Sequence, residues 1–213
     1  FRQSVQDLTR SIALDSTFAP AWAALTMSYS YALFYAWAPA AEARAEIERA
    51  SARALALNDR LGDPHIAKGM ALLFADWNFP AAEAAFRRGA ELSASPAALE
   101  LSAWFYWEMG RFPEAIARVR QVIEMEPTTA QWHSDLGWFL RSAGDTAAER
   151  EATMRALELD PTFFEAHHQL GWIEMRLGKL EEAQAALDRA KALAGGDYSW
   201  SVALEGQLLV ELG

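Results

Sequence analysis

The sequence predicts an all-α fold built from repeated pairs of helices, and two observations lead to this prediction. The 213 residues are 52% hydrophobic. Ala and Leu, which favour helices, supply most of that fraction, whereas Val, Ile and Thr, which favour strands, are sparse. In addition, marker residues recur every 34 residues, a spacing typical of solenoids made of helical repeats. We therefore expect an α-solenoid.

The 34-residue period is clearest at the glycines and prolines. Pro127 and Pro161 are one period apart, and so are Gly110, Gly144 and Gly178. Each glycine follows a helix-forming stretch and can adopt the left-handed conformation that ends a helix. Each proline disfavours helix in the residue before it and can open the next turn. One period therefore contains a first helix, a turn, a second helix and a junction.

The period predicts a single solenoid domain of five full units with a half-unit at each end. The predicted ranges are 1–16 for the first half-unit, 17–59, 60–93, 94–127, 128–161 and 162–195 for the full units, and 196–213 for the last half-unit. The first full unit has about nine extra residues around "YALFYAWAPA", so we expect longer or more loosely joined helices there. The turn in "FADWNFPAAEAAF" is expected to be one residue longer than the others.

Small side chains are expected where the two helices of a unit pack together. Ala183 and Ala190 lie seven residues apart on the second helix of the fifth unit, and Leu187 lies between them. Small residues on one face of a helix let an antiparallel neighbour approach closely. Leu187 is expected to fill the space between the two helices.

The fourth and fifth units carry a recognisable pattern, "HSDLGWFLRSAGD…ALELDP" and "HHQLGWIEMRLGKLEEAQAALDRAKAL". The pattern resembles the tetratricopeptide repeat, and the resemblance covers nearly the whole chain. Trp22, His65, His133 and His167 stand where that family often has a tryptophan. The resemblance implies a right-handed superhelix of about five helix pairs with a concave groove lined by the first helices.

Two stretches narrow the resemblance, "FAPAWAALTMSYSYALFYAWAP" and "FADWNFPAAEAAFRRGAEL". They are similar to repeat domains found at the C-terminal end of bacterial multidomain regulators. In that group the repeats follow a winged-helix DNA-binding domain, a nucleotide cyclase or a protein kinase. The resemblance implies that this module regulates an attached output domain, most simply a winged-helix domain.

Charge and composition restrict the classes of partner. The chain has 29 acidic and 19 basic residues, and its net charge of −10 repels nucleic acid and anionic membrane surfaces. A charged partner is expected to be basic, unless the surplus merely keeps a helical surface soluble. No apolar run reaches the roughly 18 to 20 residues that span a bilayer. Without cysteine, the chain has no disulfide and no thiolate metal site.

The two ends of the sequence read as cuts through a repeat. The chain begins at Phe1 instead of Met, and it ends in the apolar stretch "ALEGQLLVELG". Solenoid ends normally carry polar caps. We therefore expect a cytoplasmic piece of a longer protein, in which more chain or another surface covers this end.

The histidines invite a metal site, but their spacing argues against one. His167 and His168 are neighbours on one helix and point about 100° apart, so they cannot hold one ion as an i, i+4 pair does. His133 and His167 share one repeat position that is expected to face the partner helix. We expect a structural role for both.

Motifs for catalysis are also missing. In "GWIEMRLGKL", six residues separate Gly171 from Gly178 where a phosphate loop needs four, and Leu180 replaces the Ser or Thr that would bind magnesium. Glu181 and Glu182 begin a helix, where negative charge suits the helix dipole. No arrangement of Ser or Cys with His stands out. We expect no catalytic residue, no metal, no cofactor and no enzymatic activity.

One column of residues at the repeat period carries the functional prediction: Met27, Met70, Trp104, Trp138 and Trp172. In tetratricopeptide arrays this position faces the concave groove. The neighbouring groove positions are Ala23, Tyr31, Ile66, Phe74, Glu100, Trp107, Gln131, Ser134, Arg141, Glu165, His168 and Arg176. Aromatic and methionine side chains there would suit an extended peptide or an amphipathic helix. The alternative is that the tryptophans form a buried spine.

The predicted binding residues are Met27, Met70, Trp104, Trp107, Trp138, Arg141, Trp172 and Arg176. We expect them to bind a peptide, a protein or a neighbouring domain of the same parent chain, and neither nucleic acid nor membrane. The Lys–Asn clamp with which some relatives hold a peptide carboxylate is not expected, because Ile66, Glu100 and Trp104 occupy such positions.

Two other functions stay open at this point. The first is self-assembly as a homodimer through "WSVALEGQLLVEL" at the C-terminal end. The second is a small-ligand sensor with an aromatic pocket near Trp77, Trp104 and Trp107.

Overall fold

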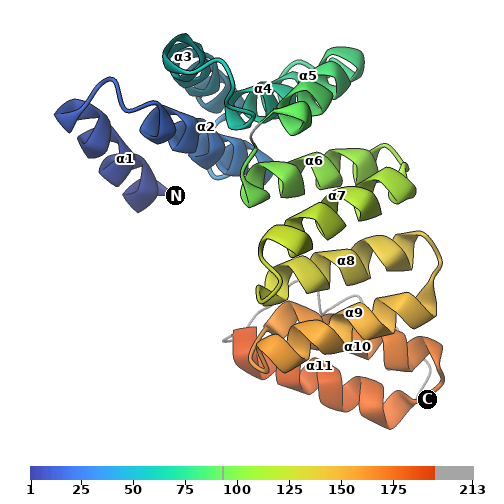
Figure 1. The fold of residues 1–213 in the computed structure, drawn as a ribbon. Helices are drawn as coiled ribbons and strands as arrows, with labels where there is room; N and C mark the ends of the chain where they lie inside the picture. The colour runs from blue at the N-terminus through green and yellow to red at the C-terminus, as the bar shows by residue number, and fades with distance from the viewer. Residues whose placement is uncertain (93, 195–213) are drawn as a thin grey trace. The chain divides into compact units, whose positions relative to one another are not determined.

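The computed structural model describes residues 1–92 and 94–194, and within these ranges the regular structure is entirely α-helical. The helices are α1 (Arg2–Leu14), α2 (Ala19–Phe34), α3 (Ala40–Leu57), α4 (Asp63–Phe74), α5 (Phe79–Glu91), α6 (Pro96–Glu108), α7 (Phe112–Met125), α8 (Ala130–Ser142), α9 (Thr146–Leu159), α10 (Phe164–Arg176) and α11 (Leu180–Ala194). The all-α prediction is confirmed (Figure 1).

The helices follow each other as pairs. Each full unit predicted from the period contains one pair, from α2 with α3 to α10 with α11, and α1 falls in the first half-unit. The partners of a pair pack against each other, as α8 does with α9 and α10 with α11 (Figure 1). The last predicted half-unit, 196–213, lies outside the described residues.

The chain divides into two compact parts, which we call unit 1 and unit 2 and which each contain several of the repeats. Unit 1 is Phe1–Phe105 and contains α1 to α5 and most of α6, while unit 2 begins at Tyr106 and contains the end of α6 and α7 to α11. In unit 1 the buried rings of Phe86 and Phe105 stack with centroids 4.5 Å apart. In unit 2 the large buried side chains include Phe139, Ile173 and Leu187. The prediction of one continuous domain stays a prediction.

The α10–α11 pair packs through small residues, as the sequence predicts. Ala183, Leu187 and Ala190 have no exposed surface. A Cβ atom on Gly171 would lie 2.9 Å from the Leu187 side chain, closer than carbon atoms normally approach. Leu187 therefore occupies the space that the missing side chain of Gly171 leaves.

The repeat junctions share one side-chain hydrogen bond. His167 Nε2 lies 2.9 Å from the carbonyl oxygen of Pro161, and His133 Nε2 lies 3.0 Å from that of Pro127. At the same repeat position, Trp22 Nε1 donates to the carbonyl of Ser16 at 3.0 Å. A carbonyl can only accept, so each histidine must carry its proton on Nε2. The structural role expected for these histidines is to tie the start of a unit to the junction before it.

The turns inside the units need a left-handed residue. Gly178, one of the three periodic glycines, has φ +72. In the first two full units this conformation falls on Ala36 and Trp77, with φ of 54 and 53, so a residue with a side chain adopts it there. The first full unit also has the longer helices expected of it, with 16 residues in α2 and 18 in α3.

Candidate partner-binding face

The first helices of the full units carry the column of residues that was predicted to bind. Met27 on α2 and Met70 on α4 are buried, with 7% and 1% of their surface exposed. A partner could reach little of these two side chains in this structure, and their assignment to a binding surface stays a prediction. Trp104, Trp138 and Trp172 are half-buried.

In unit 1 the face made by the first helices is filled by its own side chains. The Tyr31 hydroxyl on α2 donates to Glu100 on α6 at 2.8 Å, and Glu100 is only 1% exposed. The rings of Phe34 and Trp104 lie 6.0 Å apart between the same two helices. Ala23 and Ile66, two further predicted groove positions, are buried. This part of the predicted groove is therefore packed.

In unit 2 the corresponding side chains form a continuous set that we call the Trp–Arg face. The set consists of Trp107, Trp138, Arg141, Trp172 and Arg176. Trp107 lies 6.4 Å from Trp138 between ring centroids, and its Nε1 donates to Ser142 Oγ at 2.7 Å. Each of the three indoles is half-buried, so they contribute to the core and also reach the surface.

Arg141 joins the two tryptophans of α8 and α10. Its guanidinium carbon lies over the Trp138 ring at 5.0 Å and over the Trp172 ring at 4.6 Å. Such cation–π contacts hold a guanidinium by its flat face. Trp172 also packs on the buried Ala183 and Leu187, which fixes the indole to α11.

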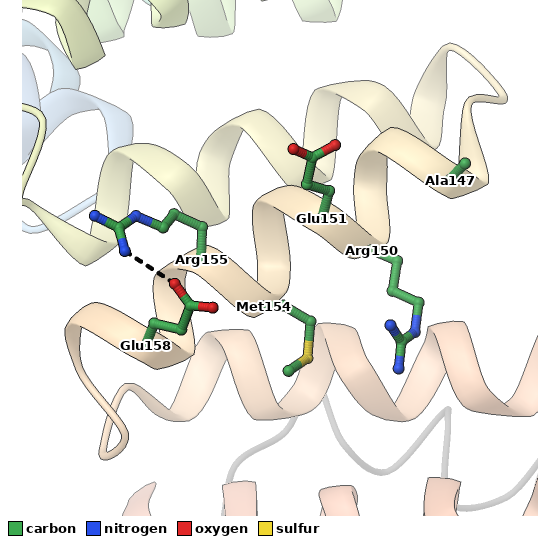
Figure 2. A pocket seen from close by; sticks show the side chains of 6 residues that line it. All are labelled: Ala147, Arg150, Glu151, Met154, Arg155 and Glu158. Atoms are coloured by element: carbon green, nitrogen blue, oxygen red, sulfur yellow. Dashed lines mark hydrogen bonds and ion pairs between the residues drawn. The ribbon is translucent and has the colours of Figure 1, made fainter.

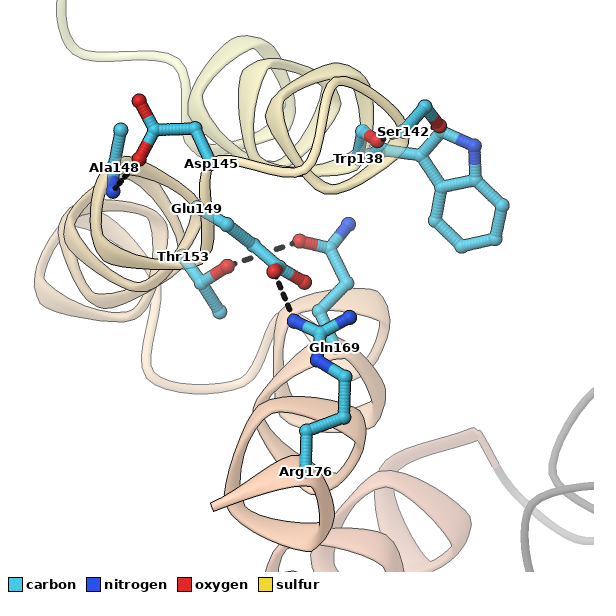
Figure 3. A network of polar contacts seen from close by, with 8 residues as sticks. All are labelled: Trp138, Ser142, Asp145, Ala148, Glu149, Thr153, Gln169 and Arg176. Atoms are coloured by element: carbon cyan, nitrogen blue, oxygen red, sulfur yellow. Dashed lines mark hydrogen bonds and ion pairs between the residues drawn. The ribbon is translucent and has the colours of Figure 1, made fainter.

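Arg176, the second arginine of the face, binds a buried carboxylate. Its Nη2 donates to Glu149 Oε2, which belongs to α9 (Figure 3). Glu149 is 1% exposed. Its burial raises the pKa of the carboxyl, while the charges of Arg176 and Arg141 act in the opposite direction.

The repeat pattern contained a signal for Glu149 that the sequence analysis missed. Glu149 stands one period after Ala115 and one before Ala183, in a column where those two alanines are fully buried. A charged residue in a column of buried alanines requires a partner of opposite charge. A comparison of residues at the same repeat position would have singled out Glu149. It would not have identified Arg176 as its partner, because Arg176 belongs to the next repeat unit.

Other polar residues surround Glu149 in the core of unit 2. Thr153 Oγ1 donates to Gln169 Oε1 at 3.1 Å (Figure 3). Gln169 Nε2 in turn donates to Ser134 Oγ at 2.8 Å. These three residues are buried. The network holds the first helices α8 and α10 at a fixed spacing, and these helices carry Trp138, Arg141 and Trp172.

The remaining predicted groove positions in unit 2 differ in exposure. Ser134 and His168 are buried, Glu165 is half-buried and Gln131 is exposed. Burial raises the pKa of the Glu165 carboxyl. None of these four residues belongs to the Trp–Arg face.

The outer side of α9 has a hollow of a different character. It is lined by Ala147, Arg150, Glu151, Met154, Arg155 and Glu158 (Figure 2). Arg155 and Glu158 form an ion pair of 2.9 Å there, and both side chains are about half exposed. Charged, solvated side chains of this kind are typical of the outer surface of a helix, so we assign no ligand to the hollow.

The described residues also bear on two other features, a metal site and a membrane-spanning helix. No group of three His, Asp or Glu side chains in residues 1–92 and 94–194 is placed to hold a metal ion. No helix in the same ranges is both long and apolar enough to cross a membrane. The indole of Trp77, offered above as part of a ligand pocket, is 73% exposed and encloses nothing.

Comparisons with known proteins agree with the fold. The sequence profile of the tetratricopeptide repeat matches residues 152–185, from α9 into α11. No curated protein matches the chain. The solved structures that it resembles include YrrB, described as a TPR protein with an unusual peptide-binding site, at 15% identity and a TM-score of 0.60 over 93% of this chain and 97% of that one.

Two other solved structures are also similar. PilF of Pseudomonas aeruginosa matches with 16% identity and a TM-score of 0.68, over 89% of this chain and 84% of that one. The APC/C hetero-tetramer Cut9–Hcn1 matches with 16% identity and a TM-score of 0.71, over 96% of this chain and 39% of that one. At such identities the likeness establishes the fold, which is that of tetratricopeptide-repeat proteins. The profile match and these structures support that family, whose members generally act as scaffolds for binding peptides or proteins.

Proposed function

We propose that this chain is a non-catalytic interaction module that binds a peptide or protein segment on the Trp–Arg face of unit 2. The observation that carries the proposal is the stack of Trp138, Arg141 and Trp172. These side chains come from two successive first helices, α8 and α10. The guanidinium carbon of Arg141 lies 5.0 Å from the centre of the Trp138 ring and 4.6 Å from the centre of the Trp172 ring. Trp and Arg are the residues most often found at the energetic centre of protein interfaces.

The half-burial of the indoles supports this proposal. A tryptophan that is fixed on one side loses little conformational freedom when a ligand covers its other side. Trp172 is held by Ala183 and Leu187, and Trp107 is held by its hydrogen bond to Ser142. The face is therefore organised before a partner arrives.

In the parent protein, the module would bind a partner and thereby regulate an attached output domain, such as a winged-helix DNA-binding domain. This part rests on the resemblance of the first two units to repeat domains of bacterial regulators. The bound segment would then belong to another protein or to a neighbouring domain of the same chain. A parent gene that encodes no output domain would exclude this role and leave the binding proposal in place.

Self-assembly is the second candidate, because the segment 200–212 is largely apolar. This segment lies outside the described residues, so the proposal has to be tested in solution. Light scattering across a wide range of concentrations should show a monomer if the Trp–Arg face carries the function. A dimer that disappears when the segment is deleted would favour self-assembly.

The binding proposal is tested by paired substitutions. Trp138→Ala and Trp172→Ala should each weaken capture of peptides from a random library by about tenfold or more. Trp77→Ala is the matched control, because it removes an indole that is 73% exposed and lies in unit 1. Equal losses in all three variants, or losses that only follow a fall in melting temperature, would contradict the proposal.

A further inference from the structure

We propose that Arg141 is the receptor for a carboxylate of the bound partner, so that the Trp–Arg face selects peptide segments carrying Asp or Glu. This inference rests on the proposed function, because it specifies the partner chemistry of the same face. It begins from the geometry of one guanidinium group.

The contacts of Arg141 occupy its flat face, and on its edge Nη1 is buried, so the side that a ligand can reach is that of Nε and Nη2. The guanidinium lies over the rings of Trp138 and Trp172. Stacking of this kind uses the π surface, whereas the five N–H donors of arginine point outward in the guanidinium plane. Two indoles thus fix the plane of a fork of donors, and a carboxylate can bind to such a fork through both oxygens.

Arg141 has no counter-ion among the described residues. Glu149, the carboxylate whose charge acts on it, is bound to Arg176. Nη1 of Arg141 is buried and has no hydrogen-bond partner in the described part of the chain. Arg141 and Arg176 both act electrostatically on Glu149, and Arg176 is the one that forms an ion pair with it.

The charge of Arg141 is partly withdrawn from water, which is unfavourable in the absence of a ligand. Desolvation lowers the pKa of Arg141, the charge of Glu149 acts in the opposite direction, and the charge of Arg176 lowers it further. An anion at the edge of the guanidinium would compensate the buried charge. A bound carboxylate therefore stabilises this arrangement more than a neutral ligand of the same shape would.

The surroundings favour a peptide acid over a small inorganic anion. The indoles of Trp138 and Trp172 adjoin the guanidinium, Trp107 lies beside Trp138, and all three offer apolar surface to the residues that flank an acid. The ligand class is therefore an acidic segment with bulky apolar neighbours. Arg141 also lies outside the positions Ile66, Glu100 and Trp104, where a Lys–Asn clamp was not expected.

An acidic ligand contrasts with the basic partner that the net charge of −10 suggests. Net charge describes the long-range field, and salt at physiological concentration screens that field beyond about 8 Å. A carboxylate in contact with Arg141 responds to the positive charge of this guanidinium. The local arrangement therefore decides the sign of the bound group.

The test uses short random peptides selected on the full chain. Each binder is made again with its acids replaced one at a time, Glu by Gln and Asp by Asn, and binding is measured on the wild type and on Arg141→Gln. In each binder, one acid is expected to bind residue 141. Replacing that acid should weaken binding to the wild-type protein about tenfold, and binding to the Arg141→Gln protein less than about twofold. Arg155→Gln on the outer side of α9 is the control, and it should behave as the wild type.

The possible outcomes separate the two proposals. Binders without an acid, or equal losses on the wild type and on Arg141→Gln, overturn the carboxylate receptor and leave the proposed function standing. If the selection yields no binder, or if Trp138→Ala and Trp172→Ala do not weaken binding, the result counts against both the carboxylate receptor and the proposed function. If Arg141→Gln does not fold, Arg141→Lys replaces it, because a lysine keeps the charge and loses the fork. If the Arg141→Lys protein prefers the acid peptide over the amide peptide as strongly as the wild type does, the two-oxygen geometry is overturned as well.

Discussion

Tyr31 on α2 donates a hydrogen bond of 2.8 Å to Glu100 on α6, across 69 residues of sequence. The Tyr31 oxygen also lies 3.3 Å from the carbonyl oxygen of Ala97. A hydroxyl has one proton, so the nearer Glu100 oxygen is its main acceptor and the Ala97 carbonyl lies at the outer limit of a hydrogen bond. Burial raises the pKa of Glu100 to about 7, while the hydrogen bond from Tyr31 acts in the opposite direction.

The Glu100 carboxyl should make the stability of the protein depend on pH. Its pKa is about 7 in the folded chain and 4.5 in the unfolded reference, so between these values the folded state binds more protons. Stability should therefore fall as pH rises from about 4.5 to 7, by on the order of 3 kcal/mol. Urea unfolding at pH 5 and pH 8 measures the change.

Glu100→Gln is the control for this prediction, because an amide keeps the shape of the protonated acid and cannot ionise. Its stability should vary less with pH than that of the wild type, and the two proteins should differ most above pH 7. Parallel pH profiles would show that Glu100 is already ionised in the folded chain.

The pair of Glu149 and Arg176 should respond asymmetrically to substitution. Arg176→Ala leaves the buried Glu149 carboxylate without its hydrogen-bonded partner, which should cost about 3 kcal/mol. Glu149→Ala restores the alanine that this column has at Ala115 and Ala183, and Arg176, whose side chain is 33% exposed, can turn to water. We expect that variant to change stability by less than about 1 kcal/mol.

Thermal or urea unfolding of the two single variants and of the double variant tests this asymmetry. The double variant should be close to Glu149→Ala, since neither leaves a buried carboxylate. A Glu149→Ala protein as unstable as Arg176→Ala would mean that the ion pair contributes net stability to the polar core of unit 2.

The helix pairs could be predicted from the sequence because local signals define them. The glycine at position 178 ends a helix by its own conformational freedom, and Ala183 shows a packing face by its size. These properties belong to single residues and recur at a fixed period, so they need no knowledge of distant contacts. The all-α fold of the described residues is therefore recovered from the sequence.

Whether the predicted groove is open or filled by side chains could not be predicted in the same way. Met70 shares its column with Trp172, yet it is buried because the first helices of unit 1 are joined by contacts such as Tyr31 with Glu100. Such contacts connect residues two repeat units apart and depend on how closely the first helices approach. Periodicity assigns a residue to a face, but it does not say whether that face is open.

The junction bond of His167 makes a specific prediction about its replacement. His167→Trp should be tolerated within about 0.5 kcal/mol, because Trp22 forms the same bond to Ser16 with its indole nitrogen. His167→Phe keeps the ring and loses the donor to Pro161, which should cost about 1 kcal/mol. Unfolding midpoints compare the two variants, and equal effects would show that only the ring matters at this position.

The final prediction concerns the contact between α10 and α11. Ala183→Leu adds a branched side chain at a position with no exposed surface, where α10 is so close that a Cβ atom on Gly171 would lie 3.5 Å from the carbonyl oxygen of Ala183. Overpacking of this kind should cost about 1–3 kcal/mol. Glu182→Leu places the same side chain on the exposed side of the helix and should change stability by less than about 0.5 kcal/mol. Urea unfolding distinguishes the two variants, and a similar loss in both would mean that α11 presents a different face to α10.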